Sequence, residues 1–373
     1  MNQKRSGLIP ISNVEFLGNE RDYVNQAVES TWVSSTGSFL DKFEKDYADE
    51  MQSTYAVSVN NGTSALLLAL KALNIGPGDE VIAPTFTFAA TVNAIIYAGA
   101  TPVLIDSMKN HWNIDTTGIE KAITPATRAI IPVHLYGHPC DMKEILRIAD
   151  SHGLYVIEDA AEAHGAEVLG RKVGTLGTIG CFSFYANKII TTGEGGMCLT
   201  QDEGINDRLR ILRDHGMNKN RRYWHDDVGF NFRMTNLNAA LGVAQLEQLG
   251  AFLRRRKFLS NIYDQGFVDQ THINHPKESP YGKPVHWLYC LFLKESSPVD
   301  RDELLMKLKE YKIDARPTFY PMHTMPPFKK LARSGRLDNS ERISRSGINL
   351  PLYPSLKDDD QQYIVEVVNS ILS

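Results

Sequence analysis

Cysteine and long apolar stretches are both scarce in this sequence. The four cysteines among 373 residues show no C-x-x-C spacing and fall far below the density of a disulfide-stapled domain. No stretch approaches the roughly 18 apolar residues that a membrane span requires, and the N-terminus lacks the uninterrupted apolar segment of a secretion signal. We therefore expect a cytoplasmic protein that is not associated with a membrane.

An excess of positive charge is also missing. Forty basic side chains stand against 44 acidic ones, for a formal net charge of −4. This balance provides no broad basic surface, so we expect no nucleic-acid partner. A small anionic substrate is still compatible with it, because a few focused Arg and Lys residues suffice for one phosphate.

Common nucleotide-binding motifs are absent as well. The glycine-rich strings at 174–180 and 193–197 lack the G-x-G-x-x-G spacing, which argues against a nicotinamide enzyme of the Rossmann type. The phosphate-binding G-x-x-x-x-G-K-[ST] loop and the protein-kinase motifs do not occur either.

Short β-branched runs alternate with amphipathic segments between residues 60 and 200, a pattern typical of a parallel sheet covered by helices. Asp141 is expected to cap one helix and Gly153 to end it. Strands are expected at 80–84, 101–106, 129–135, 154–159, 180–186 and 195–200, and helices at 64–74, 87–99, 117–123 and 141–153.

The last hundred residues predict a second, smaller α/β unit. A polar, aromatic-rich loop at 217–233 has a length that is usually functional. Further helices are expected at 205–216, 235–267 and 301–313, and strands at 286–293 and 314–319. We place the larger domain, with an N-terminal arm, at residues 1–250 and the smaller domain at 251–373, in agreement with the two to three domains (about 150 residues each) that the length suggests.

Three polar groups follow predicted strands, where ligands bind in open α/β folds. Asn61-Gly62-Thr63 begins a helix that could hold a phosphate, although plain helix capping explains the same residues. Asp159 ends a buried strand and could pair with a protonated pyridine nitrogen or cap the next turn. Lys188 could form a Schiff base with an aldehyde or be an ordinary surface charge. Together the three groups match the requirements of pyridoxal phosphate (PLP).

The chain resembles the DegT/StrS family of nucleotide-sugar aminotransferases over residues 10–360. This resemblance implies the type I PLP-dependent transferase (aspartate aminotransferase-like) α/β fold, with a large, mostly parallel mixed sheet. The matching strings include TWVSSTGSFLDKFE, VNNGTSALLLAL, GDEVIAPTFTFAATVNAI, GATPVLID, VHLYGHPCDM, VIEDAAEAHGA, FSFYANKIITTGEGGM and GFNFRMTNLNAALG.

The resemblance implies a role for each residue of the cofactor site. Lys188 matches the Schiff-base lysine, which also serves as general acid and base, and Asp159 matches the carboxylate that keeps the pyridine nitrogen protonated. Glu162 takes the position near the ring's phenolic oxygen, and Phe88 that of the aromatic residue stacked on the ring.

The phosphate site implied by the resemblance extends over two subunits. Gly62, Thr63 and Ser183 match the phosphate cradle, and Asn231 matches a residue that reaches the same phosphate from the partner subunit. The expected assembly is therefore a homodimer with shared active sites, in which the loop 217–233 lies over the neighbouring cofactor.

The resemblance implies substrate contacts for two segments, and side-chain chemistry suggests a third. Arg316, Tyr320 and His323 resemble the segment of the smaller domain that meets the substrate. Trp32 resembles a loop facing the same cleft, or else is a core aromatic. Arg222 and His225 suit a diphosphate or a sugar hydroxyl, or else are solvated loop residues.

The strings HLYGHPCDM, RRYWHDDVGFNFRMTN, RPTFYPMHTMP and GINLPLYPSL are most similar to the branch of the family that aminates C4 of GDP-4-keto-6-deoxymannose with L-glutamate. A dTDP- or UDP-linked keto sugar, and a binding or regulatory protein without turnover, remain as alternatives. No metal site is expected, because Pro139 and the preceding strand make a helical His134–His138 pair improbable.

Overall fold

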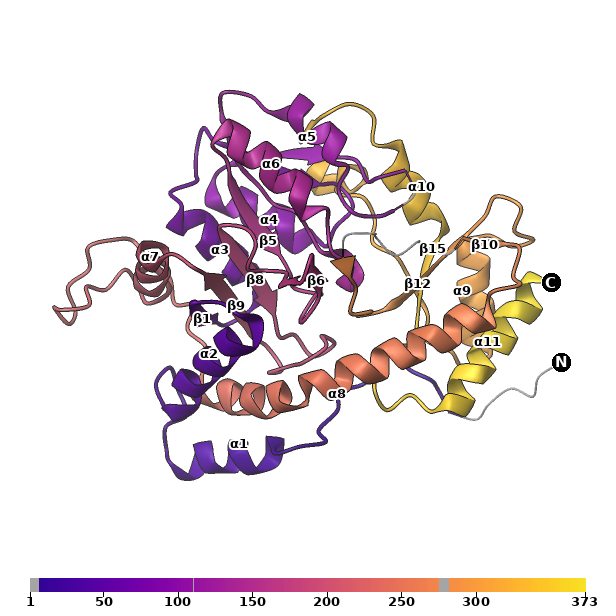
Figure 1. Ribbon diagram of the computed structural model, residues 1–373, viewed down its shortest axis with the longest axis horizontal. Helices are drawn as coiled ribbons and strands as arrows, with labels where there is room; N and C mark the ends of the chain where they lie inside the picture. The colour runs from indigo at the N-terminus through magenta and orange to yellow at the C-terminus, as the bar shows by residue number, and fades with distance from the viewer. Residues whose placement is uncertain (1–6, 110, 275–281) are drawn as a thin grey trace.

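An eight-stranded mixed sheet forms the centre of the computed structural model, which describes residues 7–109, 111–274 and 282–373 (Figure 1). The strand order is β1-β9-β8-β5-β4-β2-β3-β14. Among these described strands, β9 alone runs opposite to the rest, so its pairs with β1 and β8 are antiparallel and the other pairs are parallel. The bounds are β1 Tyr55–Val59, β2 Glu80–Pro84, β3 Thr101–Ile105, β4 Thr127–Ile130, β5 Tyr155–Asp159, β8 Ile179–Ser183, β9 Gly196–Thr200 and β14 Ala332–Arg333.

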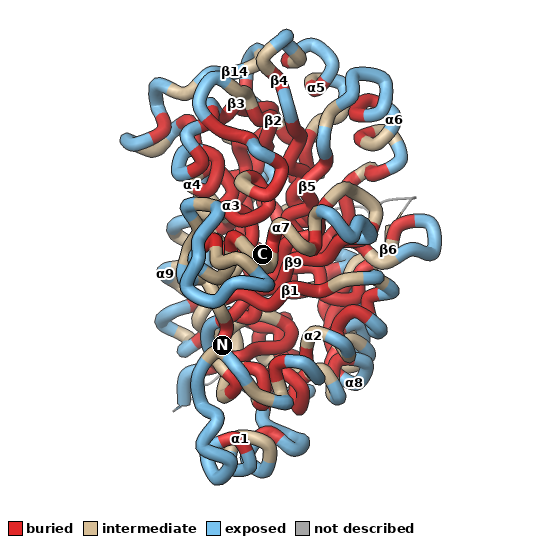
Figure 2. The backbone as a smooth tube through the Cα atoms, turned by 90° about the vertical axis from the view of Figure 1, so that its left-hand side faces the viewer, coloured by how far each residue is buried: buried red, intermediate tan, exposed pale blue. Residues whose placement is uncertain are grey.

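Helices cover both faces of this sheet, which explains its continuous apolar strands. Neighbouring residues of β2 belong to different apolar clusters: Val81 packs with α3 and α4, and Ile82 packs in the cluster on the other face. The strands therefore lie in the buried interior that Figure 2 shows in red. The helices in this part of the chain are α1 Glu20–Glu29, α2 Ser38–Met51, α3 Gly62–Ala72, α4 Ala89–Ala98, α5 Thr116–Ala122, α6 Met142–His152 and α7 Glu203–Arg213, with the 3-10 turn η1 Leu135–Gly137.

Local capping accounts for several of the helix ends. The side chain of Asn61 accepts a hydrogen bond from the N–H of Ser64 at the start of α3. The expected cap of α6 is confirmed, because Asp141 accepts from the N–H of Glu144 and Gly153 ends the helix with φ of 64°.

A second sheet, with the order β10-β12-β15-β13, lies on the other side of the molecule. The 31-residue helix α8, Asn236–Gly266, runs from α1 and α2 to α11 along both sheets (Figure 1). The division near residue 250 stays a prediction, because α8 passes through it without a break. The elements here are β10 Ile273–Asn274, β12 Tyr289–Leu293, α9 Arg301–Glu310, β13 Arg316–Pro317, η2 Met322–Thr324, η3 Pro326–Phe328, α10 Asp338–Ser346, β15 Gly347–Leu350 and α11 Asp358–Leu372.

Pairing between distant segments modifies the predicted arrangement. No bounds were predicted for strand β1, which ends at Val59, shortly before Asn61, and pairs along its whole length with β9. The two-residue strand β14 joins the edge of the large sheet beside β3. Ile9 packs in the C-terminal apolar cluster, and its N–H donates to the carbonyl of Lys312 at 2.8 Å.

Several expected strands are shorter than predicted: those at 180–186 and 286–293 are reduced to Ile179–Ser183 and Tyr289–Leu293, and two others lose more. The one at 129–135 ends at Ile130, before Pro132, which has no N–H for a ladder, and the one at 314–319 is reduced to Arg316–Pro317. A small three-stranded sheet, β11-β6-β7, is formed by β6 Glu167–Val168, β7 Arg171–Lys172 and β11 Gly282–Lys283. Among the described helices, none has the length and apolar character needed to cross a membrane.

Candidate active site

Asp159, Glu162 and Lys188 come together at the carboxyl end of the large sheet. Asp159 is the last residue of β5, Glu162 lies in the turn after it, and Lys188 lies in the segment between β8 and β9. Because β5 and β8 are parallel neighbours, their carboxyl ends open at the same edge.

The Asp159 carboxylate is buried and hydrogen-bonded. The hydroxyl of Thr91 donates to its Oδ2 at 2.8 Å, and the N–H of Ala161 donates to Oδ1 at 3.3 Å. Burial raises the pKa of Asp159, whereas the Thr91 hydrogen bond and the Lys188 charge oppose that rise. A carboxylate in this position gains stability when a cation is placed against it.

The Lys188 amine forms an ion pair with Glu162. Its Nζ is 3.4 Å from Oε1 of Glu162, and the two side chains are 11% and 5% exposed. The other oxygen, Oε2, accepts a 2.7 Å hydrogen bond from the N–H of Tyr136. Burial raises the pKa of Glu162, and Lys188 and the Tyr136 N–H partly offset this.

The N-terminus of α3 packs closely against Ser183. A Cβ atom on Gly62 would lie 2.7 Å from the Cβ of Ser183, so only glycine allows this approach. The first turn of an α-helix has N–H groups without intrahelical acceptors, and Thr63 and Ser183 add hydroxyls beside them. Such a donor set suits a phosphate.

His164 holds the Ser183 backbone in place. Its Nε2–H donates to the carbonyl of Ser183 at 2.8 Å, while Nδ1 accepts from the hydroxyl of Tyr47 at 2.8 Å. Burial lowers the pKa of His164 to about 3, so the ring is neutral at ordinary pH. This neutral ring fixes the wall opposite Gly62.

These residues fit PLP. Gly62, Thr63 and Ser183 would hold the phosphate, Asp159 the ring nitrogen, and Lys188 the aldehyde. Phe88, at the N-cap of α4, is 58% exposed and contacts Phe319 with ring centroids 5.6 Å apart, so its face is accessible to a planar ring.

The loop that carries Asn231 begins after α7, which lies away from the C-terminal sheet (Figure 1). Asn231 is exposed, and its Oδ1 accepts from Nε of Arg233 at 3.1 Å. The Arg222 guanidinium lies 5.0 Å from the ring of Tyr223, and Nδ1–H of His225 donates to the carbonyl of His215 at 2.9 Å. The role assigned to Asn231 in a partner's site stays a prediction.

The remaining substrate candidates differ in accessibility. Trp32 is 57% exposed, so its reading as a core aromatic is wrong. Tyr320 is half exposed. Nη2 of Arg316 lies 3.4 Å from Oδ2 of Asp314, so its guanidinium already has an acidic partner. His323 is only 5% exposed, and its ring bonds Thr85 at 2.7 Å and Glu341 at 3.1 Å, which makes a direct substrate contact difficult.

His134 and His138 have separate structural partners. Nε2–H of His134 donates to Glu158 at 3.1 Å, and its Nδ1 accepts from the N–H of Cys140 at 3.1 Å. His138 lies against His111, with ring centroids 4.0 Å apart. No group of three or more His, Cys, Asp or Glu side chains suited to a metal occurs in the described part of the chain.

Sequence reasoning missed four residues of this site: Thr91, Tyr136, His164 and Trp287, the last of which has its ring centroid 4.0 Å from Nζ of Lys188. Thr91 lies within a predicted helix, and nothing in the local pattern distinguishes it. Tyr136 lies between His134 and His138, which were considered as a metal pair instead. His164 follows Asp159 and Glu162 in one short string, which is the signal that could have revealed it. Trp287 lies in an expected strand and offered no signal.

Comparisons with known proteins agree with this geometry. Residues 16–369 match the DegT/DnrJ/EryC1/StrS aminotransferase family. The GDP-perosamine synthase of Caulobacter vibrioides is 46% identical over 356 residues, which cover 95% of this chain and 96% of that protein. The GDP-perosamine synthase of Escherichia coli O157:H7 is 44% identical, with 98% and 99% covered.

The fold has close matches among solved structures. The PLP form of the putative sugar aminotransferase Spr1654 from Streptococcus pneumoniae superposes with a TM-score of 0.92 at 27% identity, covering 98% of each chain. The expected type I PLP-dependent transferase fold is thereby confirmed. The chain belongs to the DegT/DnrJ/EryC1/StrS aminotransferase family of sugar aminotransferases.

Proposed function

We propose that this chain is a PLP-dependent enzyme that transfers the amino group of L-glutamate to C4 of GDP-4-keto-6-deoxymannose, forming GDP-perosamine and 2-oxoglutarate. The observation that carries the proposal is the Lys188 amine, which lies 3.4 Å from the buried Glu162 carboxylate at the sheet edge where Asp159 ends β5. The choice of sugar rests on the two GDP-perosamine synthases that are 46% and 44% identical to the chain.

The residues divide the chemistry among them. When bound, PLP supplies a protonated ring that accepts the electron pair released as a substrate carbon loses its proton. Asp159 keeps the proton on the ring nitrogen. Nζ of Lys188 removes the α-proton of glutamate in one half-reaction and delivers a proton to C4 of the sugar in the other.

Other groups hold and orient the reactants. The α3 N-terminus with Thr63 and Ser183 anchors the phosphate, and Phe88 packs on the ring. Arg316, Tyr320 and Trp32, with Arg222 and His225 from the loop, are the candidates for the sugar nucleotide. His323 would act through Thr85 and Glu341 rather than by contact.

We further propose a homodimer with shared sites, located in the cytoplasm. All four cysteines are buried and free, as suits a reducing compartment.

If Asn231 completes the partner's phosphate site, mixing Lys188→Ala chains with Asn231→Asp chains restores activity, because each mixed dimer contains one intact site. Mixtures no more active than the two variants alone would contradict shared sites.

Product analysis tests the reaction. The purified enzyme is incubated with glutamate carrying an isotopically labelled amino nitrogen and, in separate reactions, with GDP-4-keto-6-deoxymannose or a dTDP- or UDP-linked keto sugar, and each sugar nucleotide is examined by mass spectrometry. We expect the label in the product. Label only in a dTDP- or UDP-linked product would change the substrate assignment. No transfer to any keto sugar, with no effect of glutamate on the visible cofactor absorption, would indicate a binding or regulatory protein.

A further inference from the structure

The Lys188 amine has a second close neighbour besides Glu162. Its Nζ lies 4.0 Å from the ring centroid of Trp287, which is buried. The electron-rich face of an indole attracts an ammonium group, most strongly where water is excluded. The amine therefore lies between a carboxylate and an aromatic face.

Trp287 is fixed in this position by contacts on both sides. Its indole N–H donates to the carbonyl of Asn187 at 2.7 Å, the residue just before Lys188. Its backbone N–H donates to the carbonyl of Tyr136 at 3.2 Å, and the two rings are nearly parallel, with centroids 6.1 Å apart. The carbonyl that orients the indole ring therefore belongs to the residue next to the lysine that carries the amine.

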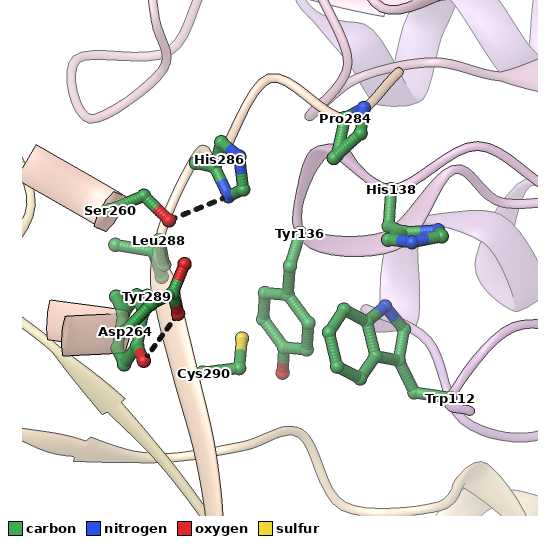
Figure 3. A pocket seen from close by; sticks show the side chains of 10 residues that line it. All are labelled: Trp112, Tyr136, His138, Ser260, Asp264, Pro284, His286, Leu288, Tyr289 and Cys290. Atoms are coloured by element: carbon green, nitrogen blue, oxygen red, sulfur yellow. Dashed lines mark hydrogen bonds between the residues drawn. The ribbon is translucent and has the colours of Figure 1, made fainter. Parts of the chain in front are cut away.

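The sequence neighbours of Trp287 line a cavity that neither Trp287 nor Lys188 lines. His286 and Leu288 line a cavity of about 70 Å³, together with Tyr136 and Trp112 (Figure 3). Trp287 does not line this cavity, and its ring faces the amine instead, with the centroid 4.0 Å from Nζ of Lys188. The contacts with Asn187 and Tyr136 hold it there, because the β12 ladder begins only at Tyr289.

We propose that Trp287 is a positioning residue for Lys188. The Trp287 ring holds the Lys188 amine beside Glu162 whenever that amine is not bonded to the cofactor. A free lysine side chain samples many rotamers, and the indole face limits that sampling while it shields one side of Nζ. The proposal rests on the proposed function, in which Lys188 is the reacting amine. Glu162 supplies the charge partner, and Trp287 supplies the orientation.

Chemical labelling of the cofactor-free protein tests this without any turnover. The carbamylation rate of Lys188 by cyanate is measured by peptide mass spectrometry, with Lys172 as the reference in the same sample. In Trp287→Leu we expect labelling about 3- to 30-fold faster, the range of a cation–π contact. Trp287→Phe keeps an aromatic face, so its Lys188 labelling rate should lie between those of the native protein and Trp287→Leu.

Trp112→Leu is the matched control. Trp112 is also buried and contacts Tyr136, with ring centroids 5.9 Å apart, but it faces the cavity. It should lower stability while the Lys188 labelling rate stays at the native value. Native labelling in a folded Trp287→Leu protein, or equal acceleration in Trp112→Leu, would overturn the proposal.

Fluorescence gives a second test if Trp287→Leu does not fold. Removal of the ammonium in Lys188→Met should change the tryptophan emission of the cofactor-free protein, and the same substitution should have no effect in Trp287→Phe. An equal change in both backgrounds would refute the contact. In the active enzyme, Trp287→Phe should lower kcat more than it raises KM for glutamate. Because labelling and emission need no transamination, a failed product assay would leave them interpretable.

Discussion

Lys188 and Tyr136 are joined through one carboxylate: Oε1 of Glu162 lies 3.4 Å from Nζ of Lys188, while Oε2 accepts the Tyr136 N–H at 2.7 Å. Tyr136 takes the left-handed backbone conformation, with φ of 54°, which is uncommon for a residue with a side chain. The turn after β4 therefore directs a backbone donor at the carboxylate that pairs with the Lys188 amine.

Replacement of this amine should abolish turnover and spare cofactor binding. We expect Lys188→Ala to retain PLP noncovalently, through the phosphate cradle and Asp159, and to lose activity by at least about 10²–10⁴-fold, the value of a positioned acid–base group. Absorption spectra and steady-state rates measure the two effects. Lys172→Ala is the control, since that ammonium pairs with Glu167 at 3.1 Å. Substantial turnover in Lys188→Ala would refute the catalytic assignment.

Glu162→Gln should stabilise the cofactor-free protein at high pH. Burial raises the folded-state pKa of Glu162 above its unfolded value of 4.5, so the folded state binds its proton more tightly. The free-energy cost of burying the charged Glu162 carboxylate applies in full above its folded-state pKa and disappears below its unfolded-state pKa. We expect a rise in Tm on the order of 1–3 °C at pH 8, shrinking toward pH 5. A gain that does not change with pH would contradict this explanation.

Thr91→Val should weaken cofactor binding without a large change of shape. The hydroxyl that donates to Asp159 at 2.8 Å is lost, and the pKa of Asp159 should rise further because this bond favours the charged form. We expect Kd for PLP to increase about 10- to 100-fold, as for a hydrogen bond to a charged group. Thr91→Ser restores the donor and should recover most of the affinity in the same absorbance titration. Equal affinities for the valine and serine variants would show that the hydroxyl has no part in binding.

Gly62→Ala should damage both stability and phosphate binding. The added Cβ would lie 2.7 Å from the Cβ of Ser183 and push α3 away from β8. Overpacking of this kind costs about 1–3 kcal/mol, measured by urea unfolding. The control is Gly250→Ala on the exposed side of α8, where the nearest atom is Nη1 of Arg254 at 3.4 Å, and where alanine should stabilise the helix slightly. A Gly62→Ala protein of native stability would contradict the close approach.

The sequence by itself determined the local elements and the placement of Asp159 and Lys188 after their strands. Helix caps such as Asp141 and apolar runs such as β5 depend on residues a few positions apart, so their pattern is readable along the chain. The family resemblance agrees with the cofactor chemistry predicted from those two residues and the α3 N-terminus.

Only the tertiary structure decided how the reactive groups are held. The contacts of Thr91 with Asp159, of Tyr136 with Glu162 and of Trp287 with Lys188 each join residues from distant parts of the chain. The pairing of β14 with β3 is of the same kind. Such contacts depend on which elements pack together. Packing is decided by complementary shape and by hydrogen bonding of buried polar groups, and neither produces a periodic pattern in the local sequence.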